Sequence, residues 1–436
     1  MALVTFDYSS LSSFGSIIFR LKNKKSDAQQ DSVLQCGRGP SGKFISEKKL
    51  RNKNNLDRNS LTRTSILETY LPPKIVLQKP VRIGFYSVEV NLATKSQIYR
   101  PDCSQLKYCA IRQEYGQKLD LLAGYNPQFN WNTRYSSLWP MTFKWISENN
   151  DKVPIEKPLK SCGGFGADFV LARGLITRIM MTPFKRQDWI LFATKINKTI
   201  FITARYNPKP SKTETEYENI LCYTGLKFEN FAARTGSAKS SKKLSKGQFG
   251  HFVCMMKLKI GHHNLLYSAE IDSAKRRKDL SKPIEEMELI EIKTSAMIKN
   301  RANYNHFCAR KAPKWWSQCY LGDTQQVLCG FRDELLIVRN TTEIDVKNLI
   351  RENRNWSPQK GAGFLNKFLN FVKHNMDREG ETKQFICNPS KNMVFTKQST
   401  LDSNIPSWFL EKYCLKNNDI IDVDNLWFKN DILTLQ

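Results

Sequence analysis

Three features that would assign a chain to familiar classes are missing from this sequence of 436 residues. It contains no run of about 18 consecutive apolar residues, the length that a membrane-spanning helix requires, so we expect no membrane segment. The 11 cysteines include no CxxC pair, and none of the five histidines lies at zinc-site spacing from a cysteine. The N-terminus lacks a basic segment followed by a clean apolar run, so we expect no secretion and reduced, mostly buried thiols.

Acidic residues are also scarce, because 41 Asp and Glu stand against 68 Lys and Arg, which gives a net charge of +27. The first 70 residues contribute little of this excess, with 12 basic and 6 acidic side chains. A folded body with this charge attracts polyanions, and RNA or DNA is the commonest such partner, although a basic protein of another kind would give the same sum. The 25 Phe and 9 Trp allow a large core, which excludes a wholly disordered chain.

Residues 21–66 are rich in Lys, Asn, Ser, Gln and Arg and lack sustained periodicity, and we predict a disordered basic arm over residues 1–70. Within it, Gly37–Lys43 (GRGPSGK) imitates a phosphate-binding loop, but Phe44 stands where that motif needs Ser or Thr for magnesium. We therefore reject a phosphate-binding loop at this position. We expect one folded domain over residues 71–420 and a C-terminal tail over 421–436.

Strands and helices are predicted to alternate along the folded part. Apolar alternation and flanking turn residues predict a hairpin over 189–205 that turns at Asn197–Lys198, and strands over 82–90, 97–99, 250–260, 263–272, 287–294 and 326–339. Helical spacing of apolar residues predicts helices over 134–149, 214–234, 312–321 and 361–373, the last of which would complete the ordered part. This interleaving predicts an α/β fold, a single large domain with mixed, twisted β-sheets flanked by helices.

Carboxylates at particular positions stand out in so basic a chain. The stretch between Glu229 and Glu270 contains seven Lys or Arg and no Asp or Glu. In a strand, residues two apart point to the same face, so Glu270 shares a face with Asp272, and Glu291 shares one with Lys293. If the two strands pair, three carboxylates and one ammonium group converge, and Glu229 at the end of a predicted helix would bring a fourth carboxylate.

Such a convergence of carboxylates favours a metal site. Carboxylates held together repel one another, and a divalent cation such as Mg²⁺ or Mn²⁺ relieves that repulsion. Two such ions about 3.5–4 Å apart can activate a water and stabilise the leaving oxygen of a phosphodiester. The order ExD, linker, ExK is therefore typical of a metal-dependent nuclease. Ordinary half-exposed strands also alternate charged and apolar residues, so each motif taken alone would be solvent-facing.

Short motifs occur in one order over about residues 80–415. They are Ser104–Tyr108 (SQLKY), Leu121–Tyr125 (LLAGY), Arg173–Arg178 (RGLITR), Thr182–Phe184 (TPF), Gly225–Glu229 (GLKFE), Ala269–Asp272 (AEID), Glu291–Ser295 (EIKTS), Lys314–Gln318 (KWWSQ), Gly330–Arg332 (GFR) and Ile405–Trp408 (IPSW). In this order the motifs resemble those of the DXO family of decapping 5′-end exoribonucleases. The resemblance says nothing about residues 1–70.

The resemblance implies a PD-(D/E)xK-nuclease-like core with metal, most simply two Mg²⁺ or Mn²⁺ ions, in a deep pocket. Carried over by position, the implied metal ligands are Glu229, Glu270, Asp272, Glu291 and the backbone carbonyl of Ile292. Lys293 and Gln318 are implied to hold the scissile phosphate and the attacking water. Arg173 is implied to contact the RNA 5′ end or backbone as a planar fork.

Three positions depart from the family motifs without removing a metal ligand. Leu226 replaces an aromatic residue, Arg178 replaces a lysine, and Ala269 replaces a glycine. Arg178 keeps the positive charge but not the compact ammonium group, so phosphate handling could differ.

Other conspicuous side chains carry weaker signals. The basic clusters Lys239–Lys246 and Lys275–Lys278 could line an RNA channel, act as a nuclear import signal or be solvated loops. Trp315 and Trp316 are expected in the core, because adjacent helix positions cannot both face one groove, and His262–His263 is expected to form a turn.

The resemblance implies a metal-dependent hydrolase of RNA 5′ ends in RNA quality control. It would remove incomplete caps, NAD caps or a 5′ triphosphate, and could also degrade the RNA body 5′→3′. It further implies a nuclear location, with the cytoplasm as an alternative, and a 5′→3′ exoribonuclease as a partner. A catalytically weak adaptor that binds RNA ends and recruits an exonuclease or chromatin partner is the alternative. A DNA nuclease with the same metal chemistry is a third interpretation.

Overall fold

The computed structural model describes residues 75–91, 96–112, 114–127, 138–153, 164–185, 187–204, 216–234, 248–350, 356–388, 393–399, 405–413 and 432–434. Contacts divide the chain into two units, 1–73 and 74–436, and every described residue lies in the second. The predicted basic arm, the GRGPSGK segment and the Lys239–Lys246 cluster lie outside the described residues. Most of the predicted tail does too, although β17 (Ile432–Thr434) falls within it.

Helices and short helical turns occur throughout the second unit. The α-helices are α2 (Trp139–Glu148), α3 (Arg173–Met181), α4 (Glu216–Ala232), α5 (Arg301–Arg310), α6 (Ala312–Leu321), α7 (Pro358–His374) and α8 (Ser407–Tyr413). Short 3-10 turns are η2 (Thr182–Phe184), η3 (Arg277–Ser281) and η4 (Val346–Leu349). Among the described helices, none is long and apolar enough to cross a membrane.

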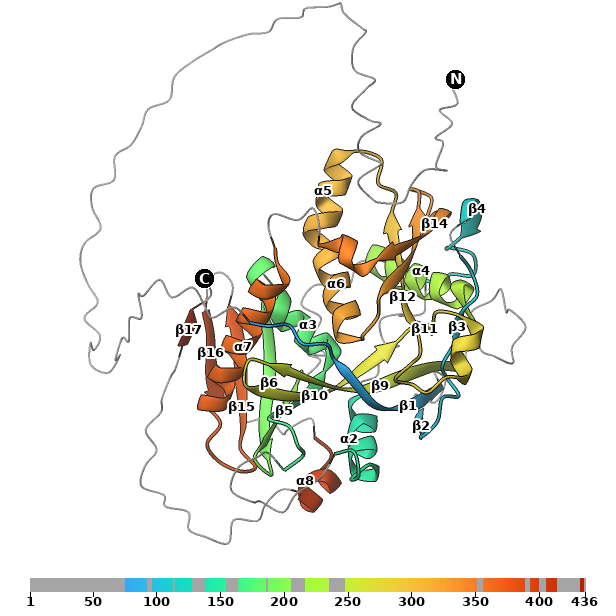
Figure 1. The fold of residues 1–436 in the computed structure, drawn as a ribbon. Helices are drawn as coiled ribbons and strands as arrows, with labels where there is room; N and C mark the ends of the chain where they lie inside the picture. The colour runs from blue at the N-terminus through green and yellow to red at the C-terminus, as the bar shows by residue number, and fades with distance from the viewer. Residues whose placement is uncertain are drawn as a thin grey trace, which may run out of the picture. The chain divides into compact units, whose positions relative to one another are not determined.

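The strands form two mixed sheets (Figure 1). The ten-stranded sheet contains, in spatial order, β17, β16 (Met393–Gln398), β15 (Thr382–Asn388), β6 (Trp189–Ile196), β7 (Thr199–Thr203), β5 (Phe169–Ala172), β10 (His263–Ile271), β9 (Gln248–Ile260), β1 (Val81–Asn91) and β2 (Ser96–Arg100). The seven-stranded sheet contains β4 (Glu114–Asp120), β14 (Ile337–Asp345), β13 (Gln326–Arg332), β12 (Leu289–Ala296), β11 (Ser273–Ala274), β3 (Tyr108–Cys109) and β8 (Ala233–Arg234). Together with the helices, the sheets confirm the predicted α/β class.

Between β10 and β11 the chain passes from the larger sheet to the smaller one across a single residue. β10 ends at Ile271 in the larger sheet, and β11 begins at Ser273 in the smaller one. Asp272 therefore stands at the junction of the two sheets.

Aromatic side chains fill the core beneath the larger sheet. On α2, Phe143 and Trp145 are fully buried because the apolar positions of this helix recur at helical spacing. The ring of Phe143 packs 4.6 Å, centroid to centroid, from Phe409 of α8, so α2 and α8 lie together against the sheet (Figure 1). Gly84 of β1 is required here, since a Cβ atom at this position would lie 2.4 Å from the Trp145 ring.

Predicted strands and helices within the described residues recur with shifted ends, and the hairpin turn lies where the sequence places it. Asn197 and Lys198 both adopt positive φ, as a two-residue turn between antiparallel strands requires. Their backbone N–H groups donate to the Glu379 carboxylate at 2.7 and 2.6 Å.

Three expectations about the elements were wrong, although the predicted helix over 361–373 is present as α7. The strand expected over 326–339 is two strands, because the chain reverses at Asp333–Leu336, where the Asp333 carboxylate accepts backbone N–H groups and Leu336 has a φ of 60°. The helix over 361–373 does not complete the ordered part, since β15, β16 and α8 follow it. Of the two histidines expected in a turn, only His262 lies in it, while His263 begins β10 and is fully buried.

Candidate active site

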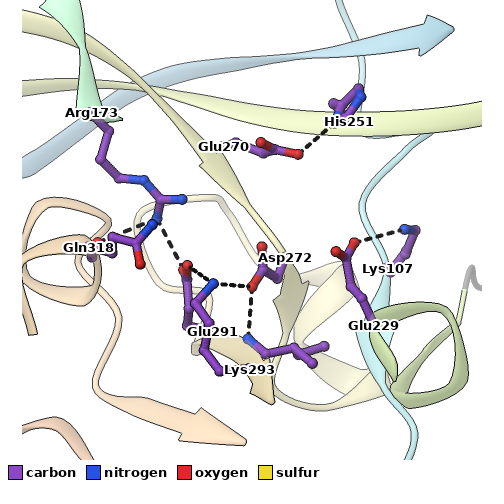
Figure 2. A network of polar contacts seen from close by, with 10 residues as sticks. Lys107, Arg173, Glu229, His251, Glu270, Asp272, Glu291, Lys293 and Gln318 are labelled. Atoms are coloured by element: carbon purple, nitrogen blue, oxygen red, sulfur yellow. Dashed lines mark hydrogen bonds and ion pairs between the residues drawn. The ribbon is translucent and has the colours of Figure 1, made fainter. Parts of the chain in front are cut away.

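A chain of buried ion pairs joins α3, β12 and the junction between the sheets (Figure 2). Arg173, the first residue of α3, places Nη1 3.0 Å from Glu291 Oε2. The other oxygen of Glu291 lies 2.6 Å from Lys293 Nζ, which is also 3.4 Å from Asp272 Oδ2. Only 1% of the Glu291 side chain is exposed, so these charges meet in a nearly dry environment. Glu291 and Lys293 thus share a face of β12, as their spacing predicts.

Asp272 reaches this group by a route that the sequence did not predict. The convergence was made conditional on pairing between the strands that carry Glu270 and Glu291, but β10 and β12 belong to different sheets. The two-residue strand β11 pairs with β12 instead, with Ser273 opposite Ile290. Asp272 Oδ2 accepts the backbone N–H of Ile292 at 2.8 Å, which fixes the carboxylate beside Glu291.

The other two candidate carboxylates lie at the margin of this group, each against its own base. Glu270 Oε1 is 2.5 Å from His251 Nδ1, and Glu229 Oε1 is 3.4 Å from Lys107 Nζ (Figure 2). Among the described residues, no three His, Cys, Asp or Glu side chains are grouped closely enough to hold a metal ion. Asp272, Glu291 and Lys293 therefore form the centre of the group, whereas Glu229 and Glu270 contact Lys107 and His251 at its margin.

Sequence reasoning assigned no role to His251 and Lys107. Hairpin register could have found His251, since Glu270 pairs with Val253, and His251 lies two residues from Val253 on the same face of β9. Lys107 stands inside the SQLKY motif, but only the tertiary fold brings it to Glu229 on α4.

Helix α6 supplies the remaining candidate, Gln318. Arg173 Nη1 lies 3.4 Å from the backbone oxygen of Gln318, so the guanidinium group bridges α6 and β12. Trp315 and Trp316 are 5% and 6% exposed, and Trp316 stacks on Tyr320. The tryptophans are therefore core residues, as predicted.

The motif departures lie away from the ion pairs. Leu226 is buried with Tyr223 in a small apolar cluster, and Ala269 is fully buried opposite Cys254 in the β9–β10 ladder. Arg178 is exposed in the last turn of α3.

The pKa values of the two central carboxyls, Asp272 and Glu291, are shifted in opposite directions. Burial, reinforced by the charge of Glu291, raises the pKa of Asp272 to about 7. Burial also opposes ionisation of Glu291, but the charges of Arg173 and Lys293 outweigh it and hold the pKa of Glu291 below its usual value. The carboxylates in turn raise the pKa of Lys293, so the ammonium group stays protonated despite its burial.

The donor set at the centre fits a divalent cation. Two carboxylates face one point, and a positive charge, the Lys293 ammonium group, already lies between them. Carboxylate oxygens are the ligands that Mg²⁺ and Mn²⁺ prefer. Ile292, whose carbonyl is a predicted ligand, is held in place through its N–H by Asp272.

A buried Asp, Glu and Lys set on a mixed sheet is the arrangement of a metal-dependent nuclease of the PD-(D/E)XK class. The model of one family, described as "RAI1 like PD-(D/E)XK nuclease", matches residues 78–410. The chain belongs to this family, which confirms the resemblance drawn from the motifs.

Curated relatives and solved structures agree with this assignment. The "Decapping and exoribonuclease protein" of Xenopus laevis is 26% identical over 350 residues, covering 76% of this chain and 85% of the relative. The human protein of the same description is 22% identical over 376 residues, covering 82% and 91%.

The fold is similar to those of fungal Rai1 structures. Scheffersomyces stipitis Rai1 in complex with (3′-NADP)+ and a calcium ion gives a TM-score of 0.61 at 16% identity, covering 77% of this chain and 95% of that one. Candida albicans Rai1 in complex with pU5-Mn²⁺ gives 0.54 at 18% identity, covering 74% and 90%. At these identities the likeness confirms the fold alone.

Proposed function

We propose that this protein is a divalent-metal-dependent hydrolase of RNA 5′ ends that removes incomplete or NAD caps or a 5′ triphosphate. The observation that carries the proposal is the buried set of Asp272, Glu291 and Lys293 joined to Arg173. Relatives named decapping and exoribonuclease proteins support it, as do neighbours solved with pU5 and manganese or with 3′-FADP.

The acidic residues would hold the metal. Asp272 and Glu291 would be the central ligands, joined by Glu229, Glu270 and the Ile292 carbonyl. When bound, the metal supplies positive charge that lowers the pKa of a water and neutralises the developing charge on the phosphate.

Basic and amide side chains would handle the phosphate. The Lys293 ammonium group carries a full charge at the carboxylates and can donate to a phosphate oxygen. Arg173, held by Glu291 and the Gln318 backbone, places a guanidinium group at the α3 side of the site. Gln318 offers an amide that can orient the attacking water.

The test is a comparison of four RNAs of one sequence, which carry a 5′ monophosphate, a triphosphate, an unmethylated cap or NAD. Each is incubated with manganese and either the wild type, the Glu270→Ala/Asp272→Ala variant or Asp272→Asn. Asparagine retains an oxygen that can accept the Ile292 N–H, so this variant removes the charge while preserving the link between the sheets. We expect product from the wild type alone. Product of equal amount from Asp272→Asn would overturn the assignment of the site.

A second candidate function is that of an RNA-end-binding adaptor. It is favoured by the contacts that Glu229 and Glu270 already make, with Lys107 and His251 respectively. Manganese separates the two functions, because an ion that binds the folded state raises the melting temperature. An unchanged melting temperature together with retained RNA binding would favour the adaptor.

A nuclear location and a 5′→3′ exoribonuclease partner are further parts of the proposal. Arg276, Arg277 and Lys278 are exposed around η3, where an import receptor could reach them, while Lys275 is paired with Glu288. A fluorescent fusion carrying Arg276→Ala and Lys278→Ala should lose nuclear accumulation. Affinity capture with the purified full chain and a candidate exoribonuclease tests the partner.

A further inference from the structure

Two stretches of the chain that lack acidic residues pack together beside the ion-pair chain. No Asp or Glu occurs between Asp168 and Asp188, which enclose α3 and η2, or between Glu291 and Asp323, which enclose α5 and α6. Helix α6 packs against both α3 and α5, and the three helices stand together in Figure 1. Positive charge is thus concentrated on one group of helices.

Four cations on these helices form a connected group that begins at the active site. Lys314 lies one helical turn before Gln318 on the same face of α6, and it interacts electrostatically with Lys293 and Glu291. Lys314 also interacts with Lys185, which follows η2, and with Arg178 in the last turn of α3. Lys185 interacts in turn with Arg310 at the end of α5. The charges therefore continue outward from the carboxylates.

These cations repel one another; Glu291 attracts Lys314, but its carboxylate is already paired with Arg173 and Lys293. Among the described residues, no carboxylate forms an ion pair with Arg178, Lys185, Arg310 or Lys314, whereas Arg173 has one carboxylate partner and Lys293 has two. Arg178, Arg310 and Lys314 reach solvent, and Lys185 is half-buried. Partial burial and neighbouring like charges lower the pKa values of Lys314 and Lys185.

We propose that Lys314, Lys185, Arg178 and Arg310 form a binding track for the sugar–phosphate backbone of single-stranded RNA that extends from the hydrolysed 5′ end. The inference rests on the proposed function, because it takes RNA as the substrate of the carboxylate site. A chain of phosphates supplies regularly spaced negative charges that match such a row of cations. The position of the four cations next to Lys293 favours RNA, because a folded protein partner or a lipid surface could bind cations located anywhere on the surface.

The track is tested with the double variant Lys185→Gln/Lys314→Gln. Its matched control is Lys259→Gln/Lys412→Gln, which removes the same charge from exposed positions on β9 and α8. Lys259 pairs with Asn264, six residues along β10 from Glu270, which is about 20 Å in an extended strand. Binding of a fluorescent 5′-monophosphorylated RNA of about 20 nucleotides is measured by anisotropy without metal, so that hydrolysis plays no part.

Counterion release sets the expected size of the effect. For single strands, log K falls by about 0.7 per phosphate contact for each unit of log salt, so losing two contacts reduces the slope by about 1.4. At about 0.1 M salt this corresponds to binding weakened by roughly 10- to 30-fold. The control should stay within about twofold, and a dinucleotide with the same 5′ end should lose much less affinity.

The outcomes separate the track from the proposed function. Equal weakening in the two double variants, or no weakening in either, would overturn the track while wild-type binding and hydrolysis still supported the function. Equal loss for the dinucleotide and the long RNA would also overturn it, because the cations would then belong to the 5′-end pocket. A wild type that binds no RNA would refute both, and melting curves of each variant exclude unfolding as the cause.

Discussion

Replacing Arg173 by alanine is the sharpest test of the buried ion pairs. In the wild type, two cations, Arg173 and Lys293, balance two carboxylates, Asp272 and Glu291, and the Glu291 side chain is only 1% exposed. Removing one partner of a buried pair leaves an uncompensated charge, which costs about 3–5 kcal/mol. Because Lys293 remains 2.6 Å from Glu291, we expect a loss near the lower limit, about 3 kcal/mol.

The assay is urea unfolding of four proteins: the wild type, Arg173→Ala, Glu291→Gln and the double variant. Glu291→Gln keeps the shape of the side chain but leaves Arg173 without its carboxylate, so it should also destabilise the protein. The double variant removes both charges, and we expect it to be more stable than the sum of the single losses predicts, by about 2 kcal/mol of coupling. Equal m-values would show that the unfolding transition itself is unchanged.

Additivity within about 0.5 kcal/mol would refute the reasoning, since groups that interact directly do not behave independently. Manganese gives a second measurement with the same variants. Above about pH 7, where Asp272 is ionised, Arg173→Ala changes the charge of the four-residue group from zero to −1, so manganese should raise the melting temperature of this variant more than that of the wild type.

Three further predictions concern the scaffold. Gly84→Ala should destabilise the protein by about 1–3 kcal/mol in urea unfolding, because the new methyl group would overlap the Trp145 ring; a change below about 0.5 kcal/mol would contradict the packing. Burial lowers the pKa of His263 from its ordinary value to about 4, so its contribution to stability is present above about pH 6.5 and lost as the pH falls toward 4. The loss of up to about 3 kcal/mol should appear as the difference between the pH profiles of the wild type and His263→Gln, and parallel profiles would refute it. Glu379→Ala should cost about 1–3 kcal/mol in thermal unfolding, because it removes the acceptor of two hairpin N–H groups, whereas Glu379→Gln should lose less.

Patterns of neighbouring residues in the sequence predicted those parts of the fold that depend on the backbone and side-chain preferences of a few adjacent residues. Asn197 and Lys198 predicted their hairpin because Asn tolerates positive φ, and the alternation of Glu291 and Lys293 placed both on one face of β12. Helix α6 was also predicted, because its apolar residues recur at helical spacing. Helix α5 was missed, since it buries only Tyr304 and Phe307 among its described residues and has no apolar stripe.

Contacts set by the tertiary fold were beyond such patterns. The reversal between β13 and β14 was hidden because Leu335 and Leu336 continue an apolar run, although Leu335 is 69% exposed at the turn. The pairing partner of β12 could not be predicted, since a two-residue strand such as β11 has no periodicity to detect. Asp272, Glu291 and Lys293 are neighbours, as the sequence suggested. They meet through the pairing of β11 with β12, however, and not through pairing between the strands that carry Glu270 and Glu291.

The junction at Asp272 explains why the site and the fold depend on each other. One oxygen of its carboxylate, Oδ2, accepts the Ile292 N–H from the smaller sheet and also contacts Lys293, while the backbone on its N-terminal side belongs to the larger sheet. The carboxylate is thus positioned only when both sheets have formed, and its pKa of about 7 results from the burial that their contact creates. An acid placed on a loop would stay solvated and ionised. Here the packing of two sheets makes ionisation of Asp272 depend on the neighbouring cations Lys293 and Arg173.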